Sequence, residues 1–252
     1  MGLPLEGQKI LQPKQVEENL KGIVYKKEKT YDVRWHENGF ALAYNSGKIV
    51  SYDRTNYYMF ELGYTKDHRE RRINRNLSFG LFNSSRSFAF GKINSLINIR
   101  AGVGKKSYKS EKAKRRGIAV GYNVQAGPSL AVLKPYYLEL IYVLDAGASE
   151  VELRSEKYSE ENAEKFLSDD VYGSSGFFRG LNEVSFTPGL QARAGLLFSM
   201  GAFDKYAKAL EVGVAGDLFI KKIDILAESE NIKNKPYFIK FYMKLEFGVR
   251  SN

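Results

Sequence analysis

The C-terminal part of the chain alternates between apolar and other side chains without a break from residue 237 to residue 249. Successive side chains of a β-strand point to opposite faces, so this period of two predicts a strand. A transmembrane strand needs about 9–11 residues, and this segment is long enough to cross a bilayer. The apolar face consists of Tyr237, Ile239, Phe241, Met243, Leu245, Phe247 and Val249, and the other face of Phe238, Lys240, Tyr242, Lys244, Glu246 and Gly248.

The same period recurs upstream in seven shorter segments, of which 40–44 has the weakest pattern. Eight strands in a chain of 252 residues suit one closed barrel. We therefore expect an all-β protein, an antiparallel up-and-down transmembrane β-barrel of eight strands, with ten strands as the alternative. The seven segments are residues 40–44, 58–65, 96–104, 117–127, 136–142, 190–198 and 210–220.

The two faces of these segments differ in a way that indicates which one points outward. The apolar face carries no charge, as contact with lipid requires. The polar face is rich in Gly, Ala, Asn and Gln, which suit the narrow interior of a small barrel better than a solvated surface. A soluble, lipocalin-like ligand-binding barrel, with its apolar face inward, is the alternative.

The polar face also holds acidic and basic side chains in nearly equal numbers, which can pair inside a narrow lumen. An eight-stranded barrel is just wide enough for side chains to fill it, so we expect no open pore. The predicted lumen charge network consists of Glu61, Arg100, Glu139, Arg193, Glu211, Asp217, Lys240, Lys244 and Glu246, with Arg250 beside it.

The predicted domain organisation is a polar periplasmic lead-in, residues 1–34, followed by a barrel of residues 35–252. The first five residues are too short and uncharged for a signal peptide, so we expect a mature or re-engineered chain. With both termini in the periplasm, residues 66–95 fall on the periplasmic side, where a connection of this length is unusual. They form either an extra hairpin or a docking element. The other predicted periplasmic connections are 128–135 and 199–206, and the outer loops are 45–56, 105–116, 144–185 and 221–235.

The net charge of +10 is concentrated in two of these connections. Basic clusters attract phosphate, so both are candidate contacts for lipid phosphate or for an acidic protein partner, with solvated loop charge as the alternative. No stacking platform or reading helix accompanies them, so no nucleic-acid partner is expected. The candidate residues are Arg69, Arg71, Arg72 and Arg75 in one connection and Lys105, Lys106, Arg115 and Arg116 in the other.

Candidate catalytic residues are few. The chain has no Cys, which excludes thiol nucleophiles, disulfides and Cys metal sites. Outer-membrane proteases use Asp and His pairs at the barrel mouth, but Asp67 and His68 fall on the predicted periplasmic side, without a second acidic pair. No phosphate-binding loop, dinucleotide fingerprint or metal-ligand spacing is present. We expect a non-enzymatic protein without cofactor or metal, and an outer-membrane hydrolase is the less favoured alternative.

Four segments carry a resemblance to a known group of proteins: residues 133–139, 171–177, 234–238 and 247–250. Most of residues 39–250, including these four segments, resembles a family of small outer-membrane β-barrel proteins of Bacteroidota. The resemblance implies a location in the bacterial outer membrane and supplies no catalytic or ligand residues. It makes a structural or accessory subunit of an outer-membrane assembly, secretion or uptake machine the expected function. The expected partners are outer-membrane lipid and other outer-membrane or periplasmic proteins.

Overall fold

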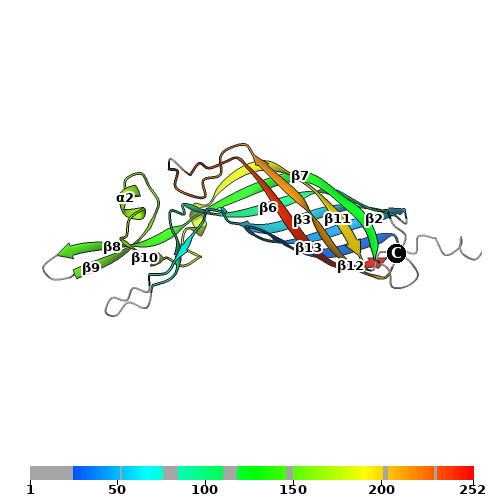
Figure 1. Ribbon diagram of the computed structural model, residues 1–252, viewed down its shortest axis with the longest axis horizontal. Helices are drawn as coiled ribbons and strands as arrows, with labels where there is room; N and C mark the ends of the chain where they lie inside the picture. The colour runs from blue at the N-terminus through cyan, green and yellow to red at the C-terminus, as the bar shows by residue number, and fades with distance from the viewer. Residues whose placement is uncertain are drawn as a thin grey trace, which may run out of the picture.

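The computed structural model describes residues 25–51, 53–75, 85–109, 118–145, 150–200, 204–229 and 232–252. Eight antiparallel strands follow one another around a closed barrel, and the first pairs with the last (Figure 1). The predicted eight-stranded, all-β, up-and-down barrel is therefore confirmed. Its strands are β1 (Lys27–His36), β2 (Gly39–Ser51), β3 (Arg54–Thr65), β6 (Asn94–Tyr108), β7 (Ala119–Pro135), β11 (Ser185–Ser199), β12 (Tyr206–Phe219) and β13 (Tyr237–Ser251).

Two strand assignments differ from the sequence prediction. Residues 136–142 are not a barrel strand, because nearly all of them belong to β8 (Tyr137–Asp145), which lies outside the barrel. The eighth barrel strand is β1, so the barrel begins inside the predicted lead-in of residues 1–34. The outward face of β1 starts with Lys27 and Lys29, which hides its alternation. Residues 1–24 lie outside the described part of the chain.

These two differences change the side on which several connections lie. The turn between β2 and β3 and the connection between β6 and β7 lie at the same end as the termini, which we name the termini end. The opposite end, the loop end, carries the long connections 66–93, 136–184 and 220–236. The prediction that 66–95 lies at the same end as the termini, with 45–56 and 105–116 at the opposite end, is therefore wrong. Because the prediction left out β1, it assigned the wrong direction to β2, β3, β6 and β7. Because it then counted 136–142 as a barrel strand, the directions of β11, β12 and β13 came out right.

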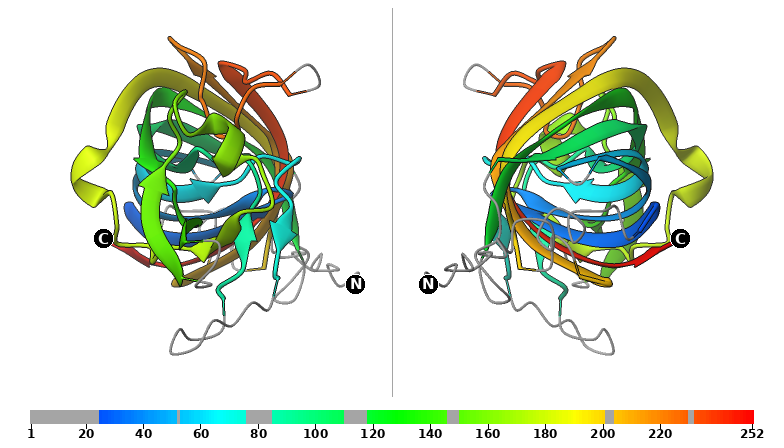
Figure 2. Two further views of the ribbon diagram at one scale, coloured as in Figure 1. Left: turned by 90° about the vertical axis from the view of Figure 1, so that its left-hand side faces the viewer. Right: turned by 90° about the vertical axis from the view of Figure 1, so that its right-hand side faces the viewer.

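Two of the long connections fold together into a lobe beyond the loop end (Figures 1 and 2). Strands β10 (Val171–Ser174), β8 and β9 (Glu150–Lys157) form a three-stranded sheet, and β4 (Arg72–Ile73) pairs with β5 (Phe88–Ala89). The short α2 (Ala163–Phe166) and η2 (Leu181–Glu183) complete the lobe. Both connections contribute to one apolar core: Phe88, Leu138, Leu140, Phe166 and Val171. We use "the lobe" for the described parts of residues 66–93 and 136–184.

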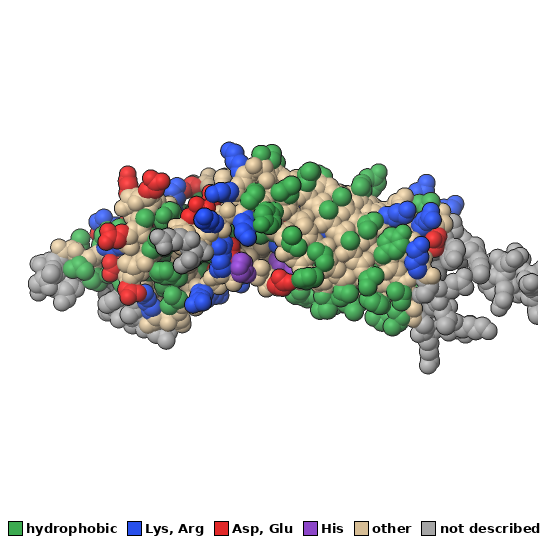
Figure 3. Space-filling model, turned by 45° about the horizontal axis from the view of Figure 1, so that its top comes forward, with side chains coloured by type: hydrophobic (Ala, Val, Ile, Leu, Met, Phe, Trp, Pro, Cys, Tyr) green, Lys and Arg blue, Asp and Glu red, His purple; other side chains and the backbone are tan. Residues whose placement is uncertain are grey.

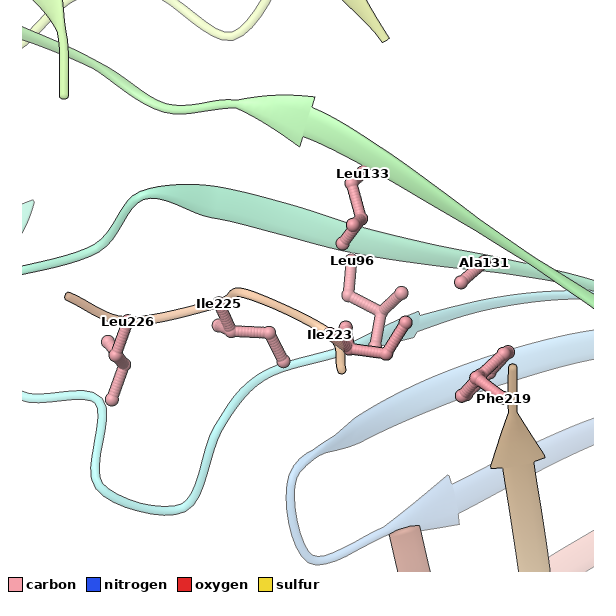
Figure 4. Packing of buried hydrophobic residues seen from close by; sticks show 7 residues of the cluster. All are labelled: Leu96, Ala131, Leu133, Phe219, Ile223, Ile225 and Leu226. Atoms are coloured by element: carbon pink, nitrogen blue, oxygen red, sulfur yellow. The ribbon is translucent and has the colours of Figure 1, made fainter. Parts of the chain in front are cut away.

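An apolar layer closes the barrel interior towards the loop end. At the loop end, the β12–β13 connection folds against inward side chains of β6, β7 and β12 (Figure 4). A smaller apolar cluster on β6, β7, β11 and β12, nearer the termini end, contains Tyr108, Ala119, Leu197 and Ala209. Leu197 is the cross-strand partner of Glu211 and Ala209 that of Glu246, so this cluster lies beside the buried charges and does not cover them. The loop-end layer consists of Leu96, Ala131, Leu133, Phe219, Ile223, Ile225 and Leu226.

The outer face of the barrel is apolar and exposed (Figure 3). Phe60 is 56% exposed and Phe241 is 67% exposed, each near the middle of its strand. The exposed charged side chains of the eight strands are all basic, and all lie towards the termini end: Lys27, Lys29, Lys48, Arg54, Lys105 and Lys208. No helix among the described residues is long and apolar enough to span a bilayer.

Candidate functional site in the barrel lumen

The structure places most of the predicted lumen residues inside the barrel, where each is at most 8% exposed. Glu139 is the exception, because it lies on β8 in the lobe, opposite Ser155 and Gly173. Lys106, predicted as a loop contact, instead points inward from β6 and is 1% exposed. The residues in the lumen are Glu61, Arg100, Arg193, Glu211, Asp217, Lys240, Lys244, Glu246 and Arg250.

Strand β1 supplies lumen charges that the sequence reading missed. Glu28, Asp32 and Arg34 occupy alternate positions of β1 and are buried. Together with Thr30 they form a row with a period of two along residues 27–36, which was the available signal. With them, the lumen charges divide into two clusters along the barrel.

The loop-side cluster centres on Glu61 and Asp217. Glu61 accepts hydrogen bonds from three arginines, at 2.5 Å from Arg34 Nη2, 2.7 Å from Arg100 Nη1 and 2.8 Å from Arg193 Nη2. Asp217 binds Arg100 through both carboxylate oxygens and lies 3.2 Å from Lys240 Nζ. Four cations therefore surround two carboxylates. Such a group is stable only when its geometry satisfies the buried charges, because removing them from water is costly.

The termini-side cluster has the opposite balance, with four carboxylates and three cations. Lys106 Nζ lies 2.8 Å from Glu28 Oε1 and also binds Glu246. Lys244 Nζ lies 2.7 Å from Glu211 Oε2 and 3.3 Å from both Asp32 and Glu246. Arg250 Nε lies 2.7 Å from Glu28 Oε2. The strands of the barrel are thus linked across the interior as well as along their backbones.

Tyr242 connects the two clusters. Its hydroxyl donates a 2.5 Å hydrogen bond to Glu211 Oε1, and its ring centroid lies 5.5 Å from the Arg34 guanidinium carbon. A cavity of about 10 Å³ lies beside it, lined also by His36 and Lys240. That volume has room for about one water molecule. This part of the lumen is therefore filled with side chains, as the prediction of a plugged barrel requires.

The described residues do not assemble a recognisable catalytic arrangement. No group of three or more His, Asp or Glu side chains suited to a metal is found in the described ranges. His68 is exposed, with Nδ1 3.5 Å from Asp67 Oδ1. Asp67 is occupied by Arg69, whose Nε and Nη2 each donate to it at 2.9 Å. This pair lies at the loop end, whereas the prediction placed it at the same end as the termini.

Two of the four clustered arginines have structural partners. Arg69 Nη2 donates to Lys233 O at 3.3 Å, which links two loop-end connections. Arg75 binds the carbonyl and the carboxylate of Asp169, which links the two connections of the lobe. Arg71 and Arg72 are exposed. Of the second basic group, Lys105 is exposed on the outer face, and Arg115 and Arg116 lie outside the described residues.

No protein-family model matches the sequence, and no curated protein matches it either. Solved structures similar to this chain include the N-terminal β-barrel domain of Pseudomonas aeruginosa OprF, at 8% identity, covering 90% of this chain and 97% of that chain, with a TM-score of 0.33. Another is Ail, the attachment invasion locus protein of Yersinia pestis, at 9% identity, covering 89% and 95%, with a TM-score of 0.34. Similarity at this level carries no conclusion about function, which must come from the geometry of this chain.

Proposed function

We propose that this protein spans the bacterial outer membrane, with its termini in the periplasm and its lobe outside the cell. The observation that carries this proposal is the inverted distribution of side chains. The barrel buries its carboxylates and exposes apolar side chains such as Phe60 and Phe241, an arrangement favourable only where lipid surrounds the outer face. In outer-membrane barrels the long loops face outward and the short turns face the periplasm, which gives the orientation.

The function that this geometry supports best is a non-enzymatic structural or accessory subunit of an outer-membrane assembly, secretion or uptake machine. Ion pairs fill the lumen and an apolar layer closes it at the loop end, which argues against transport through the barrel. The lobe has its own apolar core and projects from the barrel, as a docking element for another protein would. The resemblance to small barrel proteins of Bacteroidota stays a prediction, because no family model and no curated protein matches the sequence, and it leaves the machine unnamed.

Partition of the protein between detergent and the aqueous fraction tests the proposal that it spans a membrane. We expect the protein to require detergent for extraction and to migrate differently on a gel before and after heating. A soluble lipocalin-like barrel is the second candidate, and it would purify from the aqueous fraction without detergent. That result would overturn the proposal.

Affinity purification from native membranes tests the accessory role. Because Arg69 and Arg75 stabilise the loops, the docking test uses the exposed Arg71 and Arg72. We expect an R71S/R72S variant to recover less partner, because charges at an interface rim mainly control association. A K221S/K233S variant, which removes two exposed charges from the β12–β13 connection, is the matched control. Recovery of the wild-type protein alone would contradict the role, and unchanged recovery by R71S/R72S would reject docking through these arginines.

A further inference from the structure

A groove of about 1010 Å³ runs over the outer face of the barrel near the termini end. It is lined by side chains from β1, β2, β3, β6, β7 and β11. One part of its lining is cationic and another is apolar. The residues that carry the inference are Lys27, Lys48 and Lys105 for the cationic part and Val103, Ala126 and Ala192 for the apolar part.

The cationic part places like charges side by side. Lys27 of β1 is the direct cross-strand partner of Lys48 on β2. Lys48 lies opposite Asn56, and Asn56 lies opposite Lys105. Directly opposed like charges destabilise a sheet, because their Cβ atoms are only about 4.5–5.5 Å apart. None of the salt bridges found among the described residues involves these three lysines, so an anion held between them would relieve the repulsion.

The apolar part follows the adjacent row of outward side chains. Tyr58, which is 74% exposed, lies opposite Val103. Val103 lies opposite Ala126, and Ala126 opposite Ala192. The small side chains of Ala126 and Ala192 form a floor, and Tyr58 stands beside it as a wall. An extended hydrocarbon chain fits such a floor and is stabilised there by van der Waals packing, because the bilayer around it is itself apolar.

We propose that this groove binds an anionic glycerophospholipid, with its phosphate among the three lysines and one acyl chain along the apolar floor. The assignment rests on the proposed membrane location, which puts the termini end at the periplasmic leaflet. A phosphate alone leaves the floor uncovered, and an apolar peptide leaves the lysines unpaired. A lipid with an acidic head group satisfies both parts with one molecule.

The test measures lipid retention by the intact, detergent-folded protein with native mass spectrometry. Phosphatidylglycerol and phosphatidylcholine are the probes, because they differ in net charge and share their acyl chains. We expect phosphatidylglycerol to be retained about tenfold better or more, since each nearby Lys contributes to binding of acidic lipid. In a K27Q/K48Q/K105Q variant this preference disappears. An A126W variant, which fills the floor, loses binding of phosphatidylglycerol while all three lysines remain.

The matched control is K29Q/K205Q/K208Q, which removes the same charge from the same end of the barrel but outside the groove. It retains the wild-type preference. Equal retention of both lipids by the wild-type protein, or equal loss in both triple variants, would overturn the proposal. If inorganic phosphate competes with phosphatidylglycerol and A126W has no effect, the site binds phosphate only and the lipid assignment is wrong. Failure of the wild-type protein to partition into detergent is a separate result, which rejects the membrane location itself.

Discussion

Arg100 on β6 and Asp217 on β12 face each other across the lumen and form two parallel hydrogen bonds of 2.7 Å each. Strands β7 and β11 lie between them in the barrel, so the pair connects positions that no backbone ladder joins. Bidentate ion pairs of this kind are specific in geometry and shorter and stronger than neutral hydrogen bonds. The pair therefore fixes the barrel cross-section from inside.

Replacing Asp217 by alanine leaves Arg100 and Lys240 buried without this carboxylate. Breaking a buried ion pair by removing one partner costs about 3–5 kcal/mol. We expect the free energy of unfolding to fall by that amount in a urea titration of the protein in lipid vesicles. The control is Asp53→Ala, whose carboxylate lies 3.6 Å from the exposed Arg54, and an exposed pair contributes about 0–1 kcal/mol. Equal stability of the two variants would contradict the role of the lumen network.

We expect the Phe166→Ala substitution in the apolar core of the lobe to destabilise the lobe but not the barrel. Phe166 is fully buried and packs with Phe88, Leu138, Leu140 and Val171. Truncating a buried Phe to Ala costs about 3–5 kcal/mol, so we expect the lobe to be cleaved by protease at a concentration that spares the wild type. The barrel keeps its heat-dependent gel shift, because its strands are untouched. Leu167→Ala, at the exposed neighbouring position, serves as control, and loss of the gel shift in F166A would show that lobe and barrel are one unit.

The contact of Glu183 with Lys157 and Tyr137 in the lobe is expected to depend on pH. The Glu183 carboxylate accepts hydrogen bonds from Lys157 Nζ at 2.7 Å and Tyr137 OH at 2.9 Å, which lower its pKa below the usual value. The folded protein favours the charged carboxylate, so the contact stabilises the folded lobe at pH values above the unfolded pKa of Glu183, which is about 4.3. This stabilisation is lost as the pH falls through the lower pKa that Glu183 has in the folded protein. We expect the protection of the η2 amides, taken as the exchange rate relative to the intrinsic rate at each pH, to fall in that acidic range. A Glu183→Gln variant shows no such change, and an identical pH profile in both proteins would contradict the assignment.

Conductance tests the closed lumen. Ion pairs fill the lumen and an apolar layer closes its loop end, so we expect no steady current of porin size from the protein inserted into planar bilayers. Insertion is verified by the heat-dependent gel shift of protein recovered from vesicles prepared in the same way. A steady conductance of porin size from verified insertions would show that the lumen is open.

The sequence pattern predicts the strand faces well where one face is continuously apolar, as in β13. It fails at β1 because Lys27 and Lys29 stand at the start of the outward face. It also fails at residues 136–142, because Leu138 and Leu140 face the core of the lobe. A period of two shows that one face is apolar, but does not show whether lipid or protein covers that face.

The misplaced site residues have similar physical causes. Consecutive lysines in a strand point to opposite faces, so Lys105 lies outside and Lys106 in the lumen, although they look like one basic cluster in the sequence. The pairing of Arg75 depends on Asp169, which is distant in the chain and comes close only when the two connections fold together. Arg69 instead pairs with Asp67, two residues away in the sequence.

The most direct test of the account is chemical labelling at single cysteines, because the natural chain contains none. The three sites are Glu160→Cys in the lobe, Phe60→Cys on the apolar outer face and Lys205→Cys at the termini end. A membrane-impermeant maleimide is applied to intact cells that produce each variant, and again after the outer membrane is permeabilised. We expect E160C to react in intact cells, K205C only after permeabilisation, and F60C in neither case, because lipid covers it. Rapid labelling of F60C in the folded protein, or labelling of K205C in intact cells with E160C protected, would contradict the membrane-spanning orientation proposed here.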